Sequence, residues 1–211
     1  MTAIPILCLH AVSEDTGGPL APWAMTPTRL DEHLDAIAEA GYRPLPLDVL
    51  VARVHHRMGS VPPGAMAITI DDGYADVVGV IWPRLVARGW PATLFVSTAF
   101  AGGHFLERPM LSRQEVADLA ADGLGIGAHG HRHIALDAVA PEVARADIVR
   151  SRDLLEDWLG RRITEFAYPH GFHSRRTKIE VRAAGFTSAC AVKQALSSPT
   201  DDPFALARVM P

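Results

Sequence analysis

The sequence predicts one α/β domain built on a parallel β-sheet, either doubly wound or closed into a barrel. Short apolar runs rich in β-branched residues alternate with longer segments of helical periodicity, which is the pattern of strand–helix units. No glycine-rich phosphate-binding loop follows the first apolar run, which argues against a nucleotide-binding fold. With 211 residues and no internal repeat or linker, the chain from 1 to 211 is interpreted as a single domain.

Seven apolar runs are the predicted strands. Six are strong candidates and one, 42–47, is weaker. The strong candidates cover 4–10, 65–71, 92–97, 125–129, 165–169 and 187–192. The Pro- and Gly-rich segment 17–27 is predicted to be a long loop after the first strand.

Four helices are predicted from their start and stop signals. They run from Thr26 or Thr28 to Ala40, from Ser112 to Asp122, from Pro141 to Leu159 and from Arg175 to Ala184. Glu115 stands three residues after Ser112, which is the spacing of a capping box. Gly41, Gly160 and Gly185 follow the other three helices in the usual stop position.

Composition narrows the classes of partner. A net charge of −4 with scattered Lys and Arg gives no basic stripe for nucleic acid or anionic lipid. No apolar stretch reaches the roughly 20 residues that span a bilayer. The first apolar run lacks a basic residue before it and a cleavage site after it, so we expect a buried strand and a cytoplasmic protein. Cys8 and Cys190 are interpreted as buried thiols.

Polar residues gather where predicted strands end, which is where the working residues of parallel α/β folds lie. Asp71 and Asp72 follow one apolar run, and His129, His131 and His133 follow another. Two histidines and one aspartate would form a three-ligand metal site with open positions, as in catalytic sites. A solvated Asp–Asp–Gly turn and a set of exposed loop histidines are the alternatives.

The spacing of the histidines leaves two geometries. In a helical turn His129 and His133 share a face and His131 points away, whereas in an extended segment all three lie on one side. Gly130 interrupts the strand pattern and favours the helical turn.

Three further strand-end or loop residues are weaker candidates. His10 ends the first predicted strand, His170 lies in the Pro–His–Gly sequence after the fifth strong one, and Trp23 stands in a polar loop. Taken alone, each is more often a hydrogen-bonded or packing residue than a functional one.

Seven of these segments, in this order, resemble the polysaccharide deacetylase family, also called the NodB-homology or carbohydrate esterase family 4 domain. They are LCLHAVSED (7–15), AITIDDGYAD (67–76), PATLFVS (91–97), IGAHGHRHIAL (126–136), SRDLLEDWLG (151–160), FAYPHG (166–171) and DPFALARV (202–209). The resemblance covers nearly the whole chain and implies a distorted (β/α)7 barrel.

The resemblance also implies roles for individual residues. Asp71 would be the general base, and Asp72, His129 and His133 would hold one divalent metal ion. Zinc is the expected ion, and cobalt, manganese or iron would also suit the ligands. A backbone N–H near His170 would help to stabilise the oxyanion. The expected substrate-binding residues are Tyr74, Tyr168, Pro169, Arg208 and Trp23.

The sequence departs from the family pattern at several positions. Gly130 replaces a Ser or Thr after the first histidine ligand, Ala167 stands where many members carry an arginine beside the base, and His170 stands where a tyrosine is usual. We hypothesise that Arg208 supplies the missing positive charge. The Leu-x-His motif that usually provides the general acid is absent, so His10, and next His170, are the candidate acids.

The expected function is metal-dependent removal of an N-acetyl or similar acyl group from an amino sugar or small glycan. One alternative keeps the site but takes a small non-polymeric amide as substrate. The other is a catalytically inactive barrel that acts as a binding module. The sequence leaves the oligomeric state open.

Overall fold

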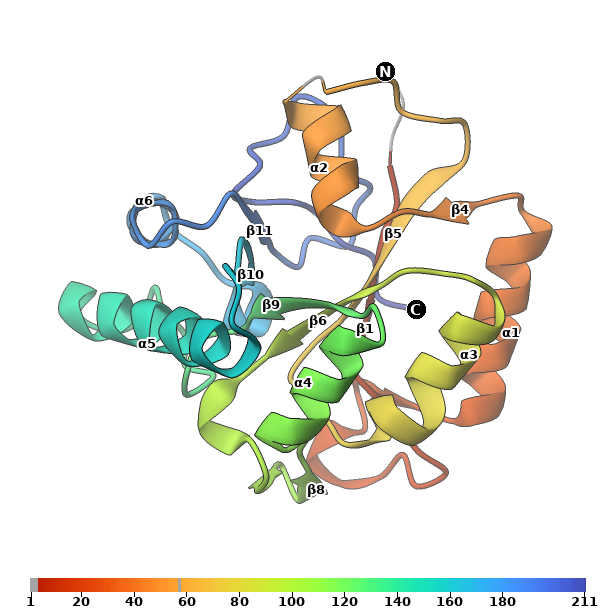
Figure 1. Ribbon diagram of the computed structural model, residues 1–211, viewed down its shortest axis with the longest axis horizontal. Helices are drawn as coiled ribbons and strands as arrows, with labels where there is room; N and C mark the ends of the chain where they lie inside the picture. Colours follow the sequence, from red (N-terminus) through yellow and green to blue (C-terminus); the bar gives the residue numbers. More distant parts are fainter. Residues whose placement is uncertain (1–3, 57) are drawn as a thin grey trace.

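The fold centres on a parallel sheet in which the seven predicted strands are all present. The computed structural model describes residues 4–56 and 58–211. Its seven-stranded sheet has the order β1-β5-β6-β9-β10-β11, with β4 paired to β5 beside this path (Figure 1). The strands are β1 (Ile6–Leu9), β4 (Arg43–Pro44), β5 (Ala65–Ile70), β6 (Thr93–Val96), β9 (Gly125–Ala128), β10 (Glu165–Ala167) and β11 (Ser188–Cys190). Each lies within a predicted run.

The sheet curls, and the C-terminal segment joins its two edges. Leu206 forms a parallel bridge with Cys190 of β11, and Val209 forms one with Leu7 of β1. Backbone hydrogen bonds from Cys8 N to Val209 O (2.9 Å) and from Ala191 N to Leu206 O (2.8 Å) hold both sides. The predicted distorted (β/α) barrel is therefore confirmed. Residues 206–209, for which no strand was predicted, close the barrel and form part of its wall.

Helices surround the sheet, and the four predicted ones are confirmed (Figure 1). The six helices of the described chain are α1 (Pro27–Glu39), α2 (Leu47–His55), α3 (Trp82–Ala87), α4 (Arg113–Ala121), α5 (Pro141–Leu159) and α6 (Arg175–Ala183). Thr26 caps α1, the Ser112–Glu115 capping box opens α4, and Gly160 adopts the left-handed conformation after α5. The prediction ended α6 one residue too late.

Sequence signals did not predict α2 and α3. No side chain caps the start of α2 at Pro46, and a π-helical stretch, Val77–Ile81, leads directly into α3. The loop predicted at 17–27 also contains some regular structure. It holds a 3-10 turn (Gly18–Leu20) and the short strand β3 (Ala24–Met25), which pairs in parallel with β2 (Ala11–Val12). A small antiparallel pair, β7 (His104–Phe105) and β8 (Arg108–Pro109), lies beyond β6.

Alternate side chains of each strand separate two apolar regions. Leu9, Ile68 and Ile70 belong to the cluster that packs between the sheet and the outer helices. Ile6 and Ala67 belong to a second cluster, inside the barrel, which also includes buried residues of α2. Since successive side chains of a strand point to opposite faces, this alternation defines an inside and an outside. No helix in the described ranges is long and apolar enough to span a membrane.

Candidate active site

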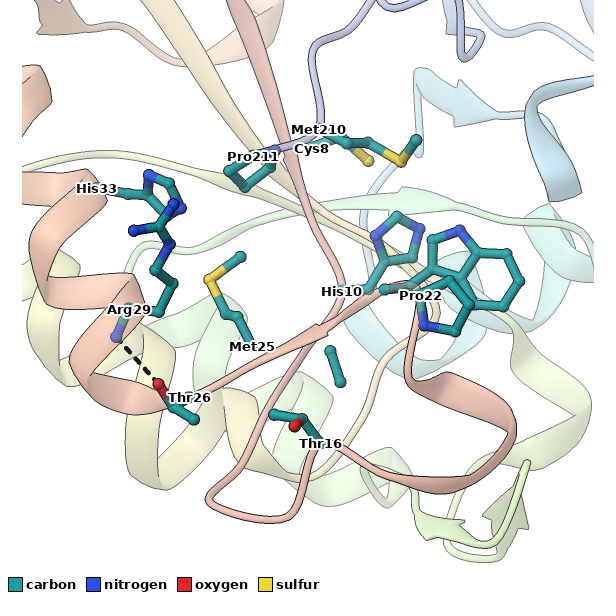
Figure 2. Close-up of a pocket in the computed structure, with 12 residues that line it drawn as sticks. Cys8, His10, Thr16, Pro22, Met25, Thr26, Arg29, His33, Met210 and Pro211 are labelled. Carbon is teal, nitrogen blue, oxygen red and sulfur yellow. Dashed lines mark hydrogen bonds between the residues drawn. The ribbon is translucent and has the colours of Figure 1, made fainter.

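A cavity of about 480 Å³ lies at the end of the barrel where the strands finish. It brings together seven of the predicted site residues: His10, Trp23, Asp71, Asp72, His129, His133 and His170. The strand-end residues, which are spread along the sequence from position 10 to position 170, therefore meet in one place. A second cavity adjoins it, and His10, Trp23 and Met210 line both (Figure 2).

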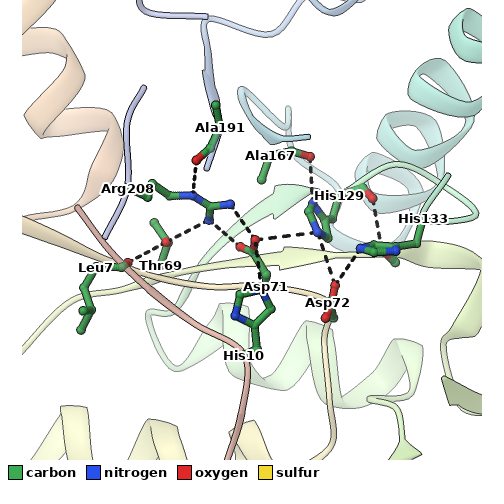
Figure 3. Close-up of polar contacts among 11 residues, drawn as sticks. Leu7, His10, Thr69, Asp71, Asp72, His129, His133, Ala167, Ala191 and Arg208 are labelled. Atoms are coloured by element: carbon green, nitrogen blue, oxygen red, sulfur yellow. Dashed lines mark hydrogen bonds and ion pairs between the residues drawn. The ribbon is translucent and has the colours of Figure 1, made fainter. Parts of the chain in front are cut away.

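Asp72, His129 and His133 form a candidate metal site (Figure 3). Asp72 Oδ1 lies 3.3 Å from His129 Nε2 and 3.1 Å from His133 Nε2, and the three possible ligand atoms lie within 4.8 Å of one another. This oxygen is buried and has no hydrogen-bond partner. A buried carboxylate oxygen that lacks a hydrogen-bond partner and faces two imidazole nitrogens costs free energy unless a cation or proton is shared among them.

The hydrogen bonding of His129 suits a metal ligand. Its Nδ1 lies 2.8 Å from the carbonyl oxygen of Ala167, to which it donates its proton, so Nε2 keeps its lone pair. Burial opposes the charged form of His129, but the carboxylates of Asp71 and Asp72 outweigh burial and raise the pKa of this histidine. The carboxylates of Asp71 and Asp72 thus stabilise a positive charge at His129. Two nitrogen donors and one oxygen donor fit a divalent transition-metal ion.

The backbone at the site is in unusual conformations. Asp72, His133 and His170 have φ values of 73°, 53° and 60°. Left-handed conformations in non-glycine residues cost free energy and gather at functional sites. The predicted helical turn at 129–133 is not formed, because the chain bends through irregular backbone there and His133 is left-handed.

His131 takes no part in the candidate metal site. Its Nδ1 lies 2.9 Å from Thr98 Oγ1, so the side chain points away from the other two histidines as predicted, although for a different backbone reason. Asp147 of α5 holds this loop. Its buried carboxylate accepts from the backbone N–H of His131 (2.7 Å) and of Arg132 (3.2 Å). This role could not be predicted from the sequence, because a single aspartate in a helical segment is ordinary.

Gly130 is explained by the same contact. It has a φ of +70°, and a Cβ at this position would lie 2.9 Å from Asp147 Oδ1. A serine or threonine here would therefore collide with the carboxylate that anchors the histidine loop. In this chain Asp147 fixes the loop from the outside, and Gly130 leaves room for its carboxylate.

Arg208 holds Asp71 through a bidentate ion pair, and His129 Nε2 lies 3.8 Å from Asp71 Oδ2 (Figure 3). The guanidinium donates from Nη1 to Asp71 Oδ1 (2.6 Å) and from Nη2 to Oδ2 (2.7 Å). Burial alone would raise the pKa of Asp71, but Arg208 and the nearby His129 lower it to about 2. Asp71 is thus an ionised carboxylate at neutral pH, and Arg208 stands beside it as hypothesised.

Arg208 is fully buried inside the barrel and its donors are satisfied there. Besides Asp71, Nε donates to Ala191 O (3.0 Å) and Nη1 to Thr69 Oγ1 (3.1 Å). Thr69 in turn donates to the carbonyl of Leu7 at 2.7 Å. A buried arginine with a bidentate carboxylate partner is a rigid arrangement, so the orientation of Asp71 is fixed.

Both candidate acids lie at the cavity. His10 Nε2 is 4.0 Å from Asp71 Oδ2, and the His170 ring lies 4.5 Å from the His133 ring between centroids. Burial lowers the pKa of each below the ordinary histidine value. His10 lies on the Asp71 side of the candidate metal site and His170 on the His133 side.

Four of the five predicted substrate-binding residues do not line the cavity, and this part of the prediction needs correction. Tyr74, Tyr168, Pro169 and Arg208 are buried. The Tyr168 hydroxyl donates to Phe204 O at 3.0 Å, and Pro169 lies against Gly130. These residues support the site from behind, and Trp23 alone of the five lines the cavity.

Comparison with known proteins identifies the family of this chain. The sequence model of the polysaccharide deacetylase family matches residues 59–189. The putative polysaccharide deacetylase YxkH of Bacillus subtilis is 23% identical over 207 residues, which cover 98% of this chain and 70% of YxkH.

Two solved structures share the fold. IcaB of Ammonifex degensii superposes with a TM-score of 0.89 at 24% identity, over 99% of this chain and 91% of IcaB. The deacetylase PplD of Streptococcus pyogenes, solved in complex with acetate, superposes with a TM-score of 0.88 at 20% identity, over 100% of this chain and 92% of PplD. The family match spans more than half of the chain and includes Asp71 and the three residues of the candidate metal site. This chain is therefore a hydrolase that belongs to the polysaccharide deacetylase family.

Proposed function

We propose that the protein is a metal-dependent deacetylase that removes the N-acetyl group from an amino sugar within a small glycan. One observation carries the proposal. Three ligand atoms, from Asp72, His129 and His133, converge beside an ionised Asp71 that Arg208 holds in place. Zinc is the proposed ion, and cobalt, manganese and iron suit the same donors. When bound, such an ion would lower the pKa of water and polarise the acyl carbonyl.

Asp71 is the proposed general base. Its carboxylate takes a proton from the attacking water, whose oxygen forms a bond to the acyl carbon. Arg208 keeps both oxygens of Asp71 in place, so that the base needs no reorientation during the reaction. A low pKa makes Asp71 a weak base, but it also keeps it ionised over the whole working pH range.

His10 is the proposed general acid. It donates a proton to the departing nitrogen as the C–N bond breaks, which yields acetate and a free amine on the sugar. His10 lies 4.0 Å from Asp71 on the side of the second cavity, so with His10 as the acid the amine would leave on that side. His170 is the other candidate, and the two differ in which side of the candidate metal site they serve.

Acetate release from N-acetylchitotriose by the zinc-loaded protein tests this proposal, with His10→Gln and His170→Gln as paired variants. The expected result is acetate release that falls about 100-fold or more in His10→Gln and far less in His170→Gln. A larger fall in His170→Gln would assign the role to His170. Wild-type rates in both variants would exclude both histidines as the acid. No acetate from any N-acetylated sugar would overturn the proposed function in favour of a small amide substrate or a binding module.

A further inference from the structure

The second cavity has a volume of about 400 Å³ and opens beside the proposed acid (Figure 2). His10, Trp23 and Met210 form the boundary that it shares with the first cavity. From His10 it extends past Met25 to Arg29 and His33 on α1 (Figure 2). A group attached to the nitrogen that His10 serves could therefore continue into this space.

Arg29 is the cationic side chain of this cavity, and Glu32 on the same helix pairs with part of its guanidinium group. Arg29 is the one formally charged side chain among its lining residues, and none of them is Asp or Glu. Glu32 accepts from Arg29 Nη1 at 2.9 Å, and the described chain provides no hydrogen-bond partner for Nε or Nη2. The protein as a whole carries a net charge of −4. The nitrogens of Arg29 that Glu32 does not occupy are thus the groups of this cavity that suit an anionic ligand.

The remaining walls suit a sugar ring. Trp23, Met25 and Met210 offer apolar surface, and Thr16 and His33 offer polar groups. Trp23 is 44% exposed, which leaves part of the indole free to contact a ligand. Pyranose rings have an apolar face and a rim of hydroxyl groups, and they need both kinds of wall.

We propose that this second cavity binds a sugar unit that carries an anionic group, a carboxylate or a phosphate, with Arg29 as the residue that recognises it. This unit adjoins the sugar that loses its acetyl group. The inference therefore rests on the proposed function, which sets the direction in which the glycan runs. The free guanidinium nitrogens of Arg29 form charge-assisted hydrogen bonds to the anion. The ring of the same unit lies against Trp23.

Calorimetric titration of the zinc-loaded protein with glucose 1-phosphate, glucuronate and glucose tests the site. None of these probes has an amide, so binding is measured without turnover. We expect the wild-type protein to bind at least one anionic probe about tenfold or more tightly than glucose, since hydrogen bonds to charged groups are stronger than those to neutral groups. Comparison of the two anionic probes distinguishes a sugar phosphate from a uronic acid.

Arg29→Gln is expected to remove this preference, and Arg29→Lys to keep part of it. Arg113→Gln is the matched control, because Arg113 also forms an exposed helical ion pair, with Asp157 at 3.4 Å, but does not line the cavity. It should bind the probes like the wild type. An unchanged preference in Arg29→Gln would overturn the inference.

Two measurements separate this site from the metal and from the proposed reaction. Binding of the anionic probes that persists in Arg29→Gln but vanishes in zinc-free protein would place the anion on the metal and overturn the inference. Where the protein is active, Arg113→Gln, which changes no residue of either cavity, should leave kcat/KM for neutral N-acetylchitotriose within about twofold of the wild type. Arg29-dependent binding without any deacetylation would support the anion site and overturn the proposed function alone.

Discussion

The two ends of the barrel interior differ in what fills them. At the end covered by α2, Ile6, Ala67 and Phe95 pack with Leu50 in an apolar cluster. At the other end, the inward positions of the same walls carry polar groups such as Asp71 and Arg208. One end therefore contributes burial of apolar surface, whereas the other holds charges that only specific partners make tolerable. A single strand therefore contributes to stability with residues at its start and to the candidate active site with residues at its end.

The polar end itself contains two unlike carboxylates. Asp71 is fully paired with Arg208, whereas Asp72 keeps a buried oxygen without a hydrogen bond. Adjacent residues of one strand end thus have different chemistry because their side chains face different neighbours. The paired one suits a base with a fixed orientation, and the unpaired one suits a metal ligand.

Asp71→Asn is expected to have the largest effect on activity. Loss of the base should lower kcat about 100- to 10,000-fold. Zinc content should stay near that of the wild type, because Asp71 is not among the proposed ligands. Elemental analysis and acetate release on the same preparation check both parts. A variant that keeps more than a tenth of wild-type turnover would exclude Asp71 as the base.

Arg208→Met is expected to destabilise the protein by about 3–5 kcal/mol, since it leaves a buried carboxylate without its partner. The pKa of Asp71 is about 2 in the folded protein and about 3.9 in an unfolded chain. Its ionisation therefore stabilises the fold above about pH 4, and this contribution is lost as pH falls toward 2.

The wild type should lose stability over that interval, and Arg208→Met should lose much less. Urea unfolding of zinc-free protein at pH 7, 4 and 3 measures the difference. Arg113→Met is the control and should change stability by less than about 1 kcal/mol, because its ion pair is exposed. Parallel pH dependence in wild type and Arg208→Met would contradict the account.

Leu50→Ala tests the apolar end. Leu50 is buried against the inside of the barrel, so truncation should cost about 2–4 kcal/mol. Zinc content and turnover per folded molecule should be unchanged, because α2 covers the opposite end from the site. The exposed Leu196→Ala provides the matched control for stability. Loss of zinc from folded Leu50→Ala would show that the two ends are coupled.

Gly130→Ser is expected to have the smallest effect, a destabilisation of about 1–2 kcal/mol from its left-handed backbone and from contact with Asp147. It should not strengthen zinc binding, although many family members carry a hydroxyl there. Thermal unfolding and zinc affinity of the variant check these two expectations. Tighter zinc binding would mean that Asp147 does not replace the hydroxyl.

The strands and the strand-end clusters could be predicted because their signals are local. An apolar run that ends in Asp71 and Asp72 identifies both the strand and its functional end, and the capping residues Thr26 and Ser112 mark helix starts. The position of residues 206–209 in the barrel wall could not be predicted from local signals. Two short bridges hold this segment to β11 and β1, and they depend on a curled sheet that no window of sequence describes.

The hydrogen-bond partners of buried polar side chains were the second feature that could not be predicted from the sequence. Family resemblance suggested Arg208 for the charge beside Asp71, but its bonds to Thr69 and Ala191 follow from the barrel interior alone. Family resemblance implied that Tyr168 binds the substrate, yet its hydroxyl donates to the carbonyl oxygen of Phe204. Asp147 was missed because its partners, the backbone groups of His131 and Arg132, are specified only by the fold.

Metal content tests the central claim most directly. Wild-type protein, His133→Ala and His131→Ala would be saturated with zinc, passed over a desalting column and subjected to elemental analysis. The account predicts about one zinc per chain in wild type and His131→Ala and far less in His133→Ala. The same zinc content in all three variants, or none in the wild type, would contradict it.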